Sequence, residues 1–255
     1  MAIEIEQFMC RSDNFGVLLH DPGTGQTACI DAPEADPIIA ALDRRGWQLT
    51  HLLVTHHHAD HTDGIDALKA LGDVEVIGPA AEAGRIRGLE RTVAGGDVLE
   101  LCGDAVEVID VPGHTAGQIA YHFRGAARAF TADALFSLGC GRVFEGTMEE
   151  MHASLQRLAA LPPDTMIHCG HEYTASNAAF ALTVDPDNER LRKRAEEVRS
   201  HRERHEPTLP VRLADELETN PFLRPHDASI RAGLGMADAT DAEVFAELRR
   251  RKDRA

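Results

Sequence analysis

Short apolar or alternating runs, separated by turn residues, dominate the first two-thirds of the chain. Asp-Asn and Pro-Gly pairs lie between the earliest runs, which is typical of consecutive strands joined by turns. Strands are predicted over 3–10, 15–21, 27–32, 49–55, 74–79, 98–103, 105–111, 118–123, 127–132 and 165–170. Helices are predicted over 37–45, from a cap at Thr62 or Asp63 to Leu71, and over 148–161. This part is therefore expected to be a mixed domain of strands and helices.

The pattern changes after about Tyr173, where strand-like runs end. Residues 189–205 carry dense charges of opposite sign, which is typical of an exposed helix. Four prolines divide the remaining residues into short helices, the last over 241–255: Pro207, Pro210, Pro221 and Pro225. We therefore predict two domains, a mixed one over 1–172 and a small all-helical one over 173–255.

Composition narrows the range of partners. The 255 residues are 43% hydrophobic, which is ample for a core, and the formal net charge of −16 argues against a nucleic-acid partner. No run is long enough to span a bilayer, and the N-terminus lacks a basic segment followed by an apolar stretch. The five scattered cysteines form no C-x-x-C pair, which fits reduced thiols. We expect a cytoplasmic monomer without nucleic-acid or membrane partners.

The stretch THHHADHTDG places four histidines and two aspartates directly after an apolar run. Three interpretations compete: a solvated polar loop, a fortuitous metal-binding cluster, or the first half of a metal-centred active site. In an extended chain, His56 and His58 point to one side and His57 to the other. Where the chain turns, Asp60 and His61 would face a second position. One short loop could therefore begin two metal sites.

Three other predicted strands are each followed by a residue that can bind a metal: His114, Asp133 and His171. Imidazole and carboxylate groups suit borderline divalent metals, and each site needs three or four ligands. Seven such residues, with one carboxylate able to bridge, satisfy two ions and leave room for a water. An isolated histidine after a strand is usually a hydrogen-bonded loop residue. Four coincident placements favour the metal site, with the strand ends forming one rim.

The remaining histidines and the cysteines are given structural roles. His57 is expected to support the ligands or to bond the backbone. Cysteines, including the one beside His171, are expected to be small core residues. The other histidines are expected to be surface or structural: His20, His51, His122, His152, His168, His201, His205 and His226.

The stretch THHHADH contains H-x-H-x-D-H, and the chain resembles the metallo-β-lactamase superfamily through it. Within that superfamily it resembles the glyoxalase II, or hydroxyacylglutathione hydrolase, family through PGHTAGQIAY, TADALFSLGCGRVFEGT, GHEYT, NPFLR and RRRKD. The resemblance covers essentially the whole chain. It implies an α+β protein in which an αββα sandwich, the catalytic domain, precedes a small all-helical domain that binds glutathione.

The resemblance also implies how the ligands divide between two divalent metal ions. The first ion would be held by His56, His58 and His114, and the second by Asp60, His61 and His171, with Asp133 as the bridge. Zinc is the expected metal, with iron or manganese as alternatives. Asp60 and Asp133 would also orient the attacking water, so they are the expected catalytic residues.

In the family this chain resembles, glutathione is held by residues that match five positions here: Arg142, Phe144, Tyr173, Arg249 and Lys252. The family often has Lys where this chain has Arg142, and Tyr where it has Phe144. The first difference keeps the charge, whereas the second removes one hydroxyl contact to glutathione.

The activity implied by the resemblance is hydrolysis of S-D-lactoylglutathione to glutathione and D-lactate, the second step of methylglyoxal detoxification. The partner is then a small anionic thioester, which responds to local rather than net charge. The alternatives are another enzyme of the same superfamily, such as a lactonase or a persulfide dioxygenase. The predicted helical region and the glutathione-type positions favour the thioester hydrolase.

Overall fold

The computed structural model describes residues 3–255 and divides into two compact units. The first unit comprises the chain up to Asp110 together with Ala116–Thr131, and the second comprises Val111–Thr115 together with Ala132–Ala255. Residues 1 and 2, where the predicted first domain begins, lie outside the described part. The predicted boundary between residues 172 and 173 stays a prediction.

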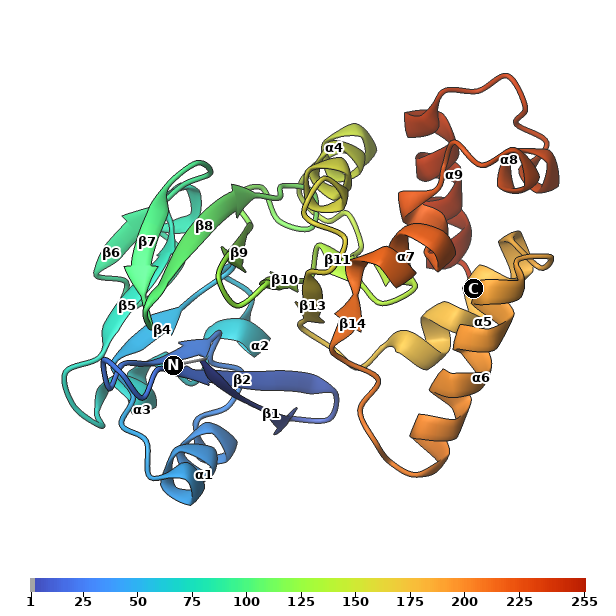
Figure 1. The fold of residues 1–255 in the computed structure, drawn as a ribbon. Helices are drawn as coiled ribbons and strands as arrows, with labels where there is room; N and C mark the ends of the chain where they lie inside the picture. Colours follow the sequence, from blue (N-terminus) through green and yellow to red (C-terminus); the bar gives the residue numbers. More distant parts are fainter. Residues whose placement is uncertain (1–2) are drawn as a thin grey trace. The chain divides into compact units, whose positions relative to one another are not determined.

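The first unit begins with a six-stranded sheet in the order of the chain (Figure 1). Its strands are β1 (Glu4–Cys10), β2 (Asn14–His20), β3 (Thr27–Ile30), β4 (His51–Leu53), β5 (Glu75–Pro79) and β6 (Arg91–Val93). The first three strands are antiparallel neighbours, and β3 to β6 are parallel. Parallel neighbours need crossover connections, which is why helices first appear after β3.

A second group of strands in this unit packs against the first sheet. It contains β7 (Val98–Leu101), β8 (Asp104–Asp110), β9 (Ile119–Phe123) and β10 (Arg128–Ala132), each antiparallel to the next. Leu53 and Ile77 from the first sheet share one buried cluster with Val106, Tyr121 and Phe130 from the second. The two sheets therefore pack face to face as a sandwich.

The opposite face of the first sheet is covered by helices (Figure 1). These are α1 (Ala35–Arg45), α2 (Ala59–Thr62) and α3 (Ile65–Lys69), followed after β5 by a short 3₁₀ helix, Ala80–Glu82. Leu52 and Val76 lie in one buried cluster with Ile38, Leu42 and Leu68 of these helices. Leu52 and Leu53 thus point to opposite faces of β4, as neighbouring strand residues must.

The predicted cap of the helix after the histidine-rich loop is wrong. The helix α3 begins after Gly64, and no side chain caps it. Thr62 ends α2, and its hydroxyl donates to the His58 carbonyl at 3.0 Å, while Asp63 forms an ion pair with Arg11. The chain forms a separate turn of helix over the predicted ligand positions; Thr62 bonds within this turn and Asp63 pairs with Arg11, so neither side chain caps α3.

The second unit contains two short antiparallel strand pairs. The hairpin of β11 (Leu135–Phe136) and β12 (Gly139–Cys140) is one pair, and β13 (Met166–Cys169) with β14 (Val211–Arg212) is the other. β14 corrects the prediction of an all-helical region after residue 173. Two residues are too short to produce a detectable alternating pattern.

The other elements of the second unit are helices. They are α4 (Met148–Ala159), α5 (Thr174–Val184), α6 (Glu189–Glu203), α7 (Leu213–Thr219), α8 (Ala228–Leu234) and α9 (Asp241–Asp253), with a 3₁₀ helix at Pro221–Leu223. Thr147 and Thr240 begin α4 and α9 with capping boxes, which confirms these predicted helices. The densely charged segment forms α6, as predicted. Among the described residues, every helix is too short or too polar to cross a membrane.

Candidate metal centre

The loop after β4 carries the first of the predicted ligand residues. The chain is extended at His58, whose φ and ψ are −60° and 145°, and α2 begins at the next residue. Asp60 and His61 therefore lie where the chain turns, as predicted, although the turn is a short helix that the sequence did not predict. His56 and His61 are buried, and the Nε2 of His56 lies 3.1 Å from the Nδ1 of His58. The loop thus brings three imidazoles together.

A buried carboxylate from the neighbouring strand fixes this loop. Asp31, directly after β3, accepts hydrogen bonds from the Thr55 amide at 2.7 Å and the Thr55 hydroxyl at 2.8 Å. Its Oδ2 also lies 2.8 Å from the Nδ1 of His61. Because a carboxylate only accepts, the Nδ1 of His61 carries the proton, and Nε2 is the nitrogen suited to a metal. The sequence did not indicate Asp31 as a functional residue, although its position at a strand end was visible.

Asn14 and Glu82 support the same loop. The Asn14 amide donates to the Asp60 carbonyl at 3.0 Å and lies 3.3 Å from its carboxylate. The buried Glu82 carboxylate accepts from the His57 amide at 2.7 Å and the Gly117 amide at 3.0 Å, and it lies 2.7 Å from the His57 Nδ1. His57 is thus bonded to Glu82 through both its backbone amide and its ring, in agreement with its predicted supporting role.

In the second unit, Asp133 lies between two histidines. Its Oδ2 is 3.3 Å from the Nε2 of His114, and its Oδ1 is 3.4 Å from the Nε2 of His171. The Nδ1 of His114 donates to the Arg142 carbonyl at 2.9 Å, which leaves Nε2 directed at the carboxylate. One oxygen per histidine is the arrangement expected of a carboxylate that bridges two ions.

Gly141 allows the chain to pass close to Asp133. A Cβ at Gly141 would lie 1.8 Å from the Asp133 carbonyl oxygen, so no other residue fits without a backbone shift. The Gly141 amide donates to the Ala134 carbonyl at 3.1 Å. This glycine therefore holds the segment that carries Arg142 and Phe144 against the predicted bridging residue.

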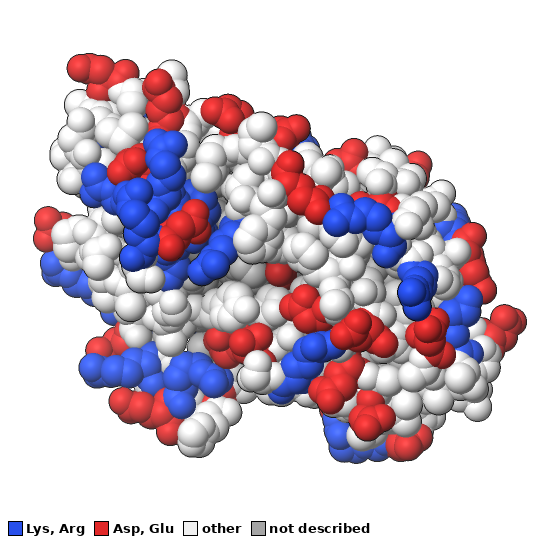
Figure 2. Space-filling view, turned by 180° about the vertical axis from the view of Figure 1, so that it is seen from behind, with Lys and Arg blue, Asp and Glu red and all other residues white. Residues whose placement is uncertain are grey.

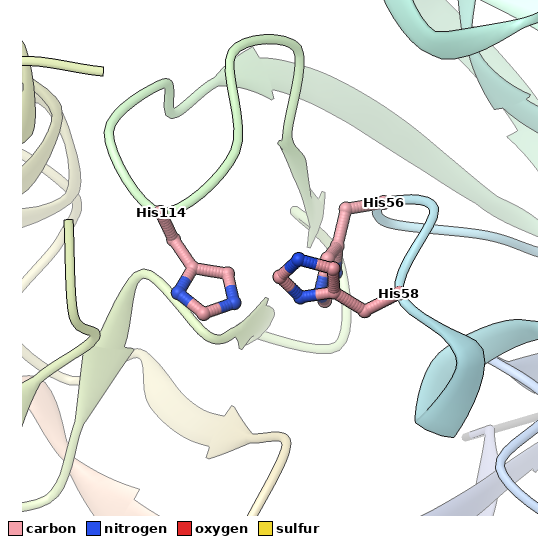
Figure 3. A group of neighbouring side chains, drawn as sticks. All are labelled: His56, His58 and His114. Atoms are coloured by element: carbon pink, nitrogen blue, oxygen red, sulfur yellow. The ribbon is translucent and has the colours of Figure 1, made fainter. Parts of the chain in front are cut away.

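All seven predicted ligand residues belong to groups whose ligand atoms lie within 4.8 Å of one another. The groups are His56, His58 and His114 (Figure 3); His56, His61 and Asp133; and Asp60, His61 and His171. Imidazole nitrogens and carboxylate oxygens without a thiolate suit zinc, iron or manganese. The residues present therefore fit a divalent metal.

The prediction that the strands before the ligand residues are neighbours, with their ends forming one rim, is wrong in one respect. β4 belongs to the first sheet, whereas β8 and β10 belong to the second and are separated there by β9. β8 and β10 run in the same direction because each is antiparallel to β9. The ligands do follow strand ends, but those strands come from more than one sheet.

Two of the predicted substrate contacts place aromatic rings against predicted ligand histidines of the second unit. The Tyr173 ring stacks on His171 with a centroid distance of 4.8 Å and an interplanar angle of 5°. The Phe144 ring lies 5.2 Å from that of His114 and is 61% exposed. Both rings are accessible to a substrate that reaches these histidines.

The predicted cationic contacts gather around the end of α9. Arg249 is only 3% exposed; it donates to the Cys140 carbonyl at 2.7 Å and pairs with Asp253 at 3.0 Å. The Lys252 amino group donates to the Ser176 carbonyl at 3.0 Å, and its pKa is lowered by burial, by Arg249 and by Arg142. Arg142 is exposed. Of the three cations, Arg142 is thus exposed, Lys252 half-buried and Arg249 buried.

The residues given structural roles behave as predicted where the structure tests them. All five cysteines are buried and free, and burial raises the pKa of Cys10 and Cys102 to about 12. His122 is buried 3.6 Å from Glu107. His20 stacks on Trp47. These contacts account for the side chains without a metal.

Comparison with known proteins separates the chain into two matched segments. Residues 12–171 match the family model described as the metallo-beta-lactamase superfamily. Residues 172–255 match the model described as the hydroxyacylglutathione hydrolase C-terminus.

Similar proteins cover the chain almost completely. A hydroxyacylglutathione hydrolase from Mesorhizobium japonicum is 57% identical over 99% of this chain and 99% of its own length. One from Brucella ovis is 56% identical over 98% of each. Among solved structures, ETHE1 from Myxococcus xanthus aligns with a TM-score of 0.69 at 24% identity, over 97% of this chain and 90% of that chain. At that identity the likeness concerns the fold alone.

Proposed function

We propose that this chain, which belongs to the hydroxyacylglutathione hydrolase family of the metallo-β-lactamase superfamily, hydrolyses the thioester bond of S-(2-hydroxyacyl)glutathiones. S-D-lactoylglutathione is the expected substrate, and glutathione and D-lactate are the products. The observation that carries the proposal is 57% identity to a hydroxyacylglutathione hydrolase along the full length of both chains. The predicted α+β class, with a metallo-β-lactamase domain followed by a largely helical C-terminal region, is confirmed.

The proposed cofactor is a pair of divalent metal ions, with zinc expected and iron or manganese as alternatives. Three histidines would hold the first ion: His56, His58 and His114. Asp60, His61 and His171 would hold the second. Asp133 supports a shared site because its two oxygens face different histidines. When bound, such ions lower the pKa of a water to near neutrality and stabilise negative charge on the substrate oxygen.

The chain's own residues would position the reactants. Asp31 keeps the His61 Nδ1 protonated, and the Arg142 carbonyl does the same for His114, so both rings present Nε2. Asp60 and Asp133 would accept hydrogen bonds from the attacking water and hold it in line with the thioester carbonyl. The departing glutathione thiolate is a good leaving group, so no strong protein acid is required.

The glutathione portion would be bound by the second unit. Tyr173 and Phe144 present rings beside His171 and His114, and Arg142 and Lys252 present cations suited to the two carboxylates of glutathione. Arg249 belongs to the same cluster, where it bonds to Cys140 and Asp253.

Local charge reconciles an anionic substrate with a net charge of −16. Figure 2 shows Lys and Arg gathered into patches between Asp and Glu, rather than a surface of one sign. Residues 249–254 hold five cations and one aspartate, so the end of α9 is locally basic. A small anion responds to such a patch within about one Debye length, roughly 8 Å at physiological salt.

The decisive experiment measures thiol release from S-D-lactoylglutathione by the purified, metal-loaded protein, with a coenzyme A thioester and a simple lactone as comparison substrates. The Arg142→Gln/Lys252→Gln variant is expected to lose about a hundredfold in kcat/KM for the glutathione thioester, as two charge-assisted bonds are removed. The Arg250→Gln/Arg251→Gln variant is the matched control, because these cations pair with Glu247. If both metals bind and no thioester is cleaved, the lactonase and persulfide dioxygenase alternatives take precedence.

A further inference from the structure

The β11–β12 hairpin lies, along the chain, between the predicted bridging ligand and two of the predicted glutathione contacts. Asp133 precedes the hairpin, and Arg142 and Phe144 follow it. Every residue from Leu135 to Cys140 is buried. At the turn, Leu138 has φ of 58°, a left-handed conformation that disfavours any residue with a Cβ. Such a turn persists only where surrounding groups hold it.

Glu216, on α7, bonds this turn through both of its carboxylate oxygens. Its side chain is fully buried, and Oε1 accepts from the Ser137 hydroxyl at 2.8 Å while Oε2 accepts from the Leu138 amide at 2.7 Å. Oε2 also accepts from Asn220 at 3.0 Å. Burial raises the pKa of this carboxyl group. The hydrogen-bond partners of its carboxylate are the turn itself and the Asn220 amide, while the charge of Arg194 opposes the rise in pKa.

Two asparagines of the helical region complete the contact. The Asn220 amide donates to the Phe136 carbonyl at 3.1 Å and to the Gly139 carbonyl at 3.0 Å. The Asn177 amide donates to the Ser137 carbonyl at 3.1 Å. A Cβ at Gly139 would lie 2.5 Å from the Asn177 amide nitrogen, so the hairpin fits closely against α5. The backbone of the turn is therefore bonded to helices on both of its strands.

We propose that Glu216 is a positioning residue for thioester hydrolysis: through Ser137 and Leu138 it fixes the hairpin that sets Asp133 relative to Arg142 and Phe144. The inference rests on the proposed function and adds a role for the FSLGCG segment. Burying a carboxylate costs free energy unless hydrogen bonds replace its contacts with water. For Glu216, two of the donors that replace water are Ser137 and Leu138, which form the turn of the hairpin. One displacement of the hairpin would change both the bridging carboxylate and the glutathione contacts.

The first test is Glu216→Gln, which keeps the shape but directs an NH₂ at one of the three donors. Expected results are a loss of about tenfold in kcat/KM, carried partly by a higher KM, and a changed absorption spectrum of the Co²⁺-loaded protein. Ser137→Ala removes one donor without altering α7 and should shift the same quantities less. It keeps the proposal testable if Glu216→Gln fails to fold.

The matched control is Asp185→Asn. Asp185 is another buried carboxylate of the helical region, paired with Arg224. This variant should lower the urea midpoint but leave KM, kcat and the Co²⁺ spectrum unchanged. If Glu216→Gln and Ser137→Ala also lower only the midpoint, Glu216 is merely structural and the proposal is overturned.

A failure of the proposed function can be told apart from a failure of this inference. Wild-type protein that cleaves no glutathione thioester would refute the function. The Co²⁺ spectrum would still show whether Glu216 positions Asp133, since that readout needs no turnover. An unchanged spectrum in both variants would refute the positioning role even in an active enzyme.

Discussion

At the scale of single residues, buried carboxylates determine which ring nitrogen of a neighbouring histidine carries the proton. Asp31 and Glu82 each bond a histidine ring and a backbone amide of the loop after β4. The histidines themselves could be predicted, because they are dense in sequence and follow an apolar run. Asp31 and Glu82 could not, since each is a single acidic residue distant from the loop and only the folded chain brings them to it.

Asp31→Asn is expected to weaken metal binding by about 10- to 100-fold. An amide can donate to the His61 Nδ1 and so favour the wrong tautomer, and it loses one acceptor for Thr55. Competition with a chromophoric chelator measures the affinity. Asp21→Asn is the control, because Asp21 is also buried in the first unit but bonds only a turn at Gly23 and Thr24. Equal weakening by both variants would contradict the specific role of Asp31.

Lys252 predicts a pH dependence for glutathione binding. Burial, then Arg249 and Arg142, lower the pKa of its amino group, so the positive charge is lost at a lower pH than in an exposed lysine. Affinity for the thioether S-methylglutathione should be full below that lowered pKa and should fall as pH rises through it. Titration calorimetry from neutral pH upward measures this. In Lys252→Arg the charge persists, so an identical decline there would argue against Lys252 as its origin.

At the scale of elements, long segments could be predicted and very short ones could not. The helices that begin at Met148 and Asp241 follow capping boxes and carry periodic apolar positions, so their starts were visible in the sequence. β11, β12 and β14 span two residues each, and their pairing depends on partners rather than on pattern. The missed cap of α3 has a similar cause, because Thr62 bonds within α2 and Asp63 pairs with the distant Arg11.

The N-cap of α9 is expected to contribute to stability but not to catalysis. Thr240→Ala should lower the free energy of unfolding by about 1 kcal/mol, because it removes the hydroxyl that accepts from the Glu243 amide. KM should not change, since Arg249 and Lys252 lie in the second half of the helix. Urea unfolding with parallel kinetics checks both statements. Thr240→Ser, which retains the hydroxyl, should behave like the wild type; a rise in KM with Thr240→Ala would contradict the separation.

At the scale of the whole molecule, the proposed metals should contribute to stability. The ligand residues span positions 56 to 171, so they come together only in the folded chain. A ligand that binds the folded state alone stabilises it by about 4 kcal/mol when its free concentration exceeds Kd a thousandfold. Chelation should therefore lower the thermal midpoint, and added Zn²⁺ should restore it. The His56→Ala/His58→Ala variant should respond much less to chelator; an equal response would place the stabilising metal elsewhere.

The order of the elements and the change of character after residue 173 were visible in the sequence because they depend on local pattern. The division into two compact units was not, because Val111–Thr115, which includes His114, belongs to the second unit while the chain on both sides of it belongs to the first. Such a division depends on long-range contacts, and hydrophobic periodicity carries no signal for it.

The way His114 is held has a consequence for how this family can diverge. The His114 ring bonds the carbonyl of Arg142, and its own carbonyl accepts from the Phe144 amide at 3.3 Å. Arg142 and Phe144 contribute only backbone atoms to these bonds, so their side chains can be exchanged without loss of either bond. Substitutions at these two positions can therefore change the exposed side chains while the predicted metal ligand His114 keeps its orientation.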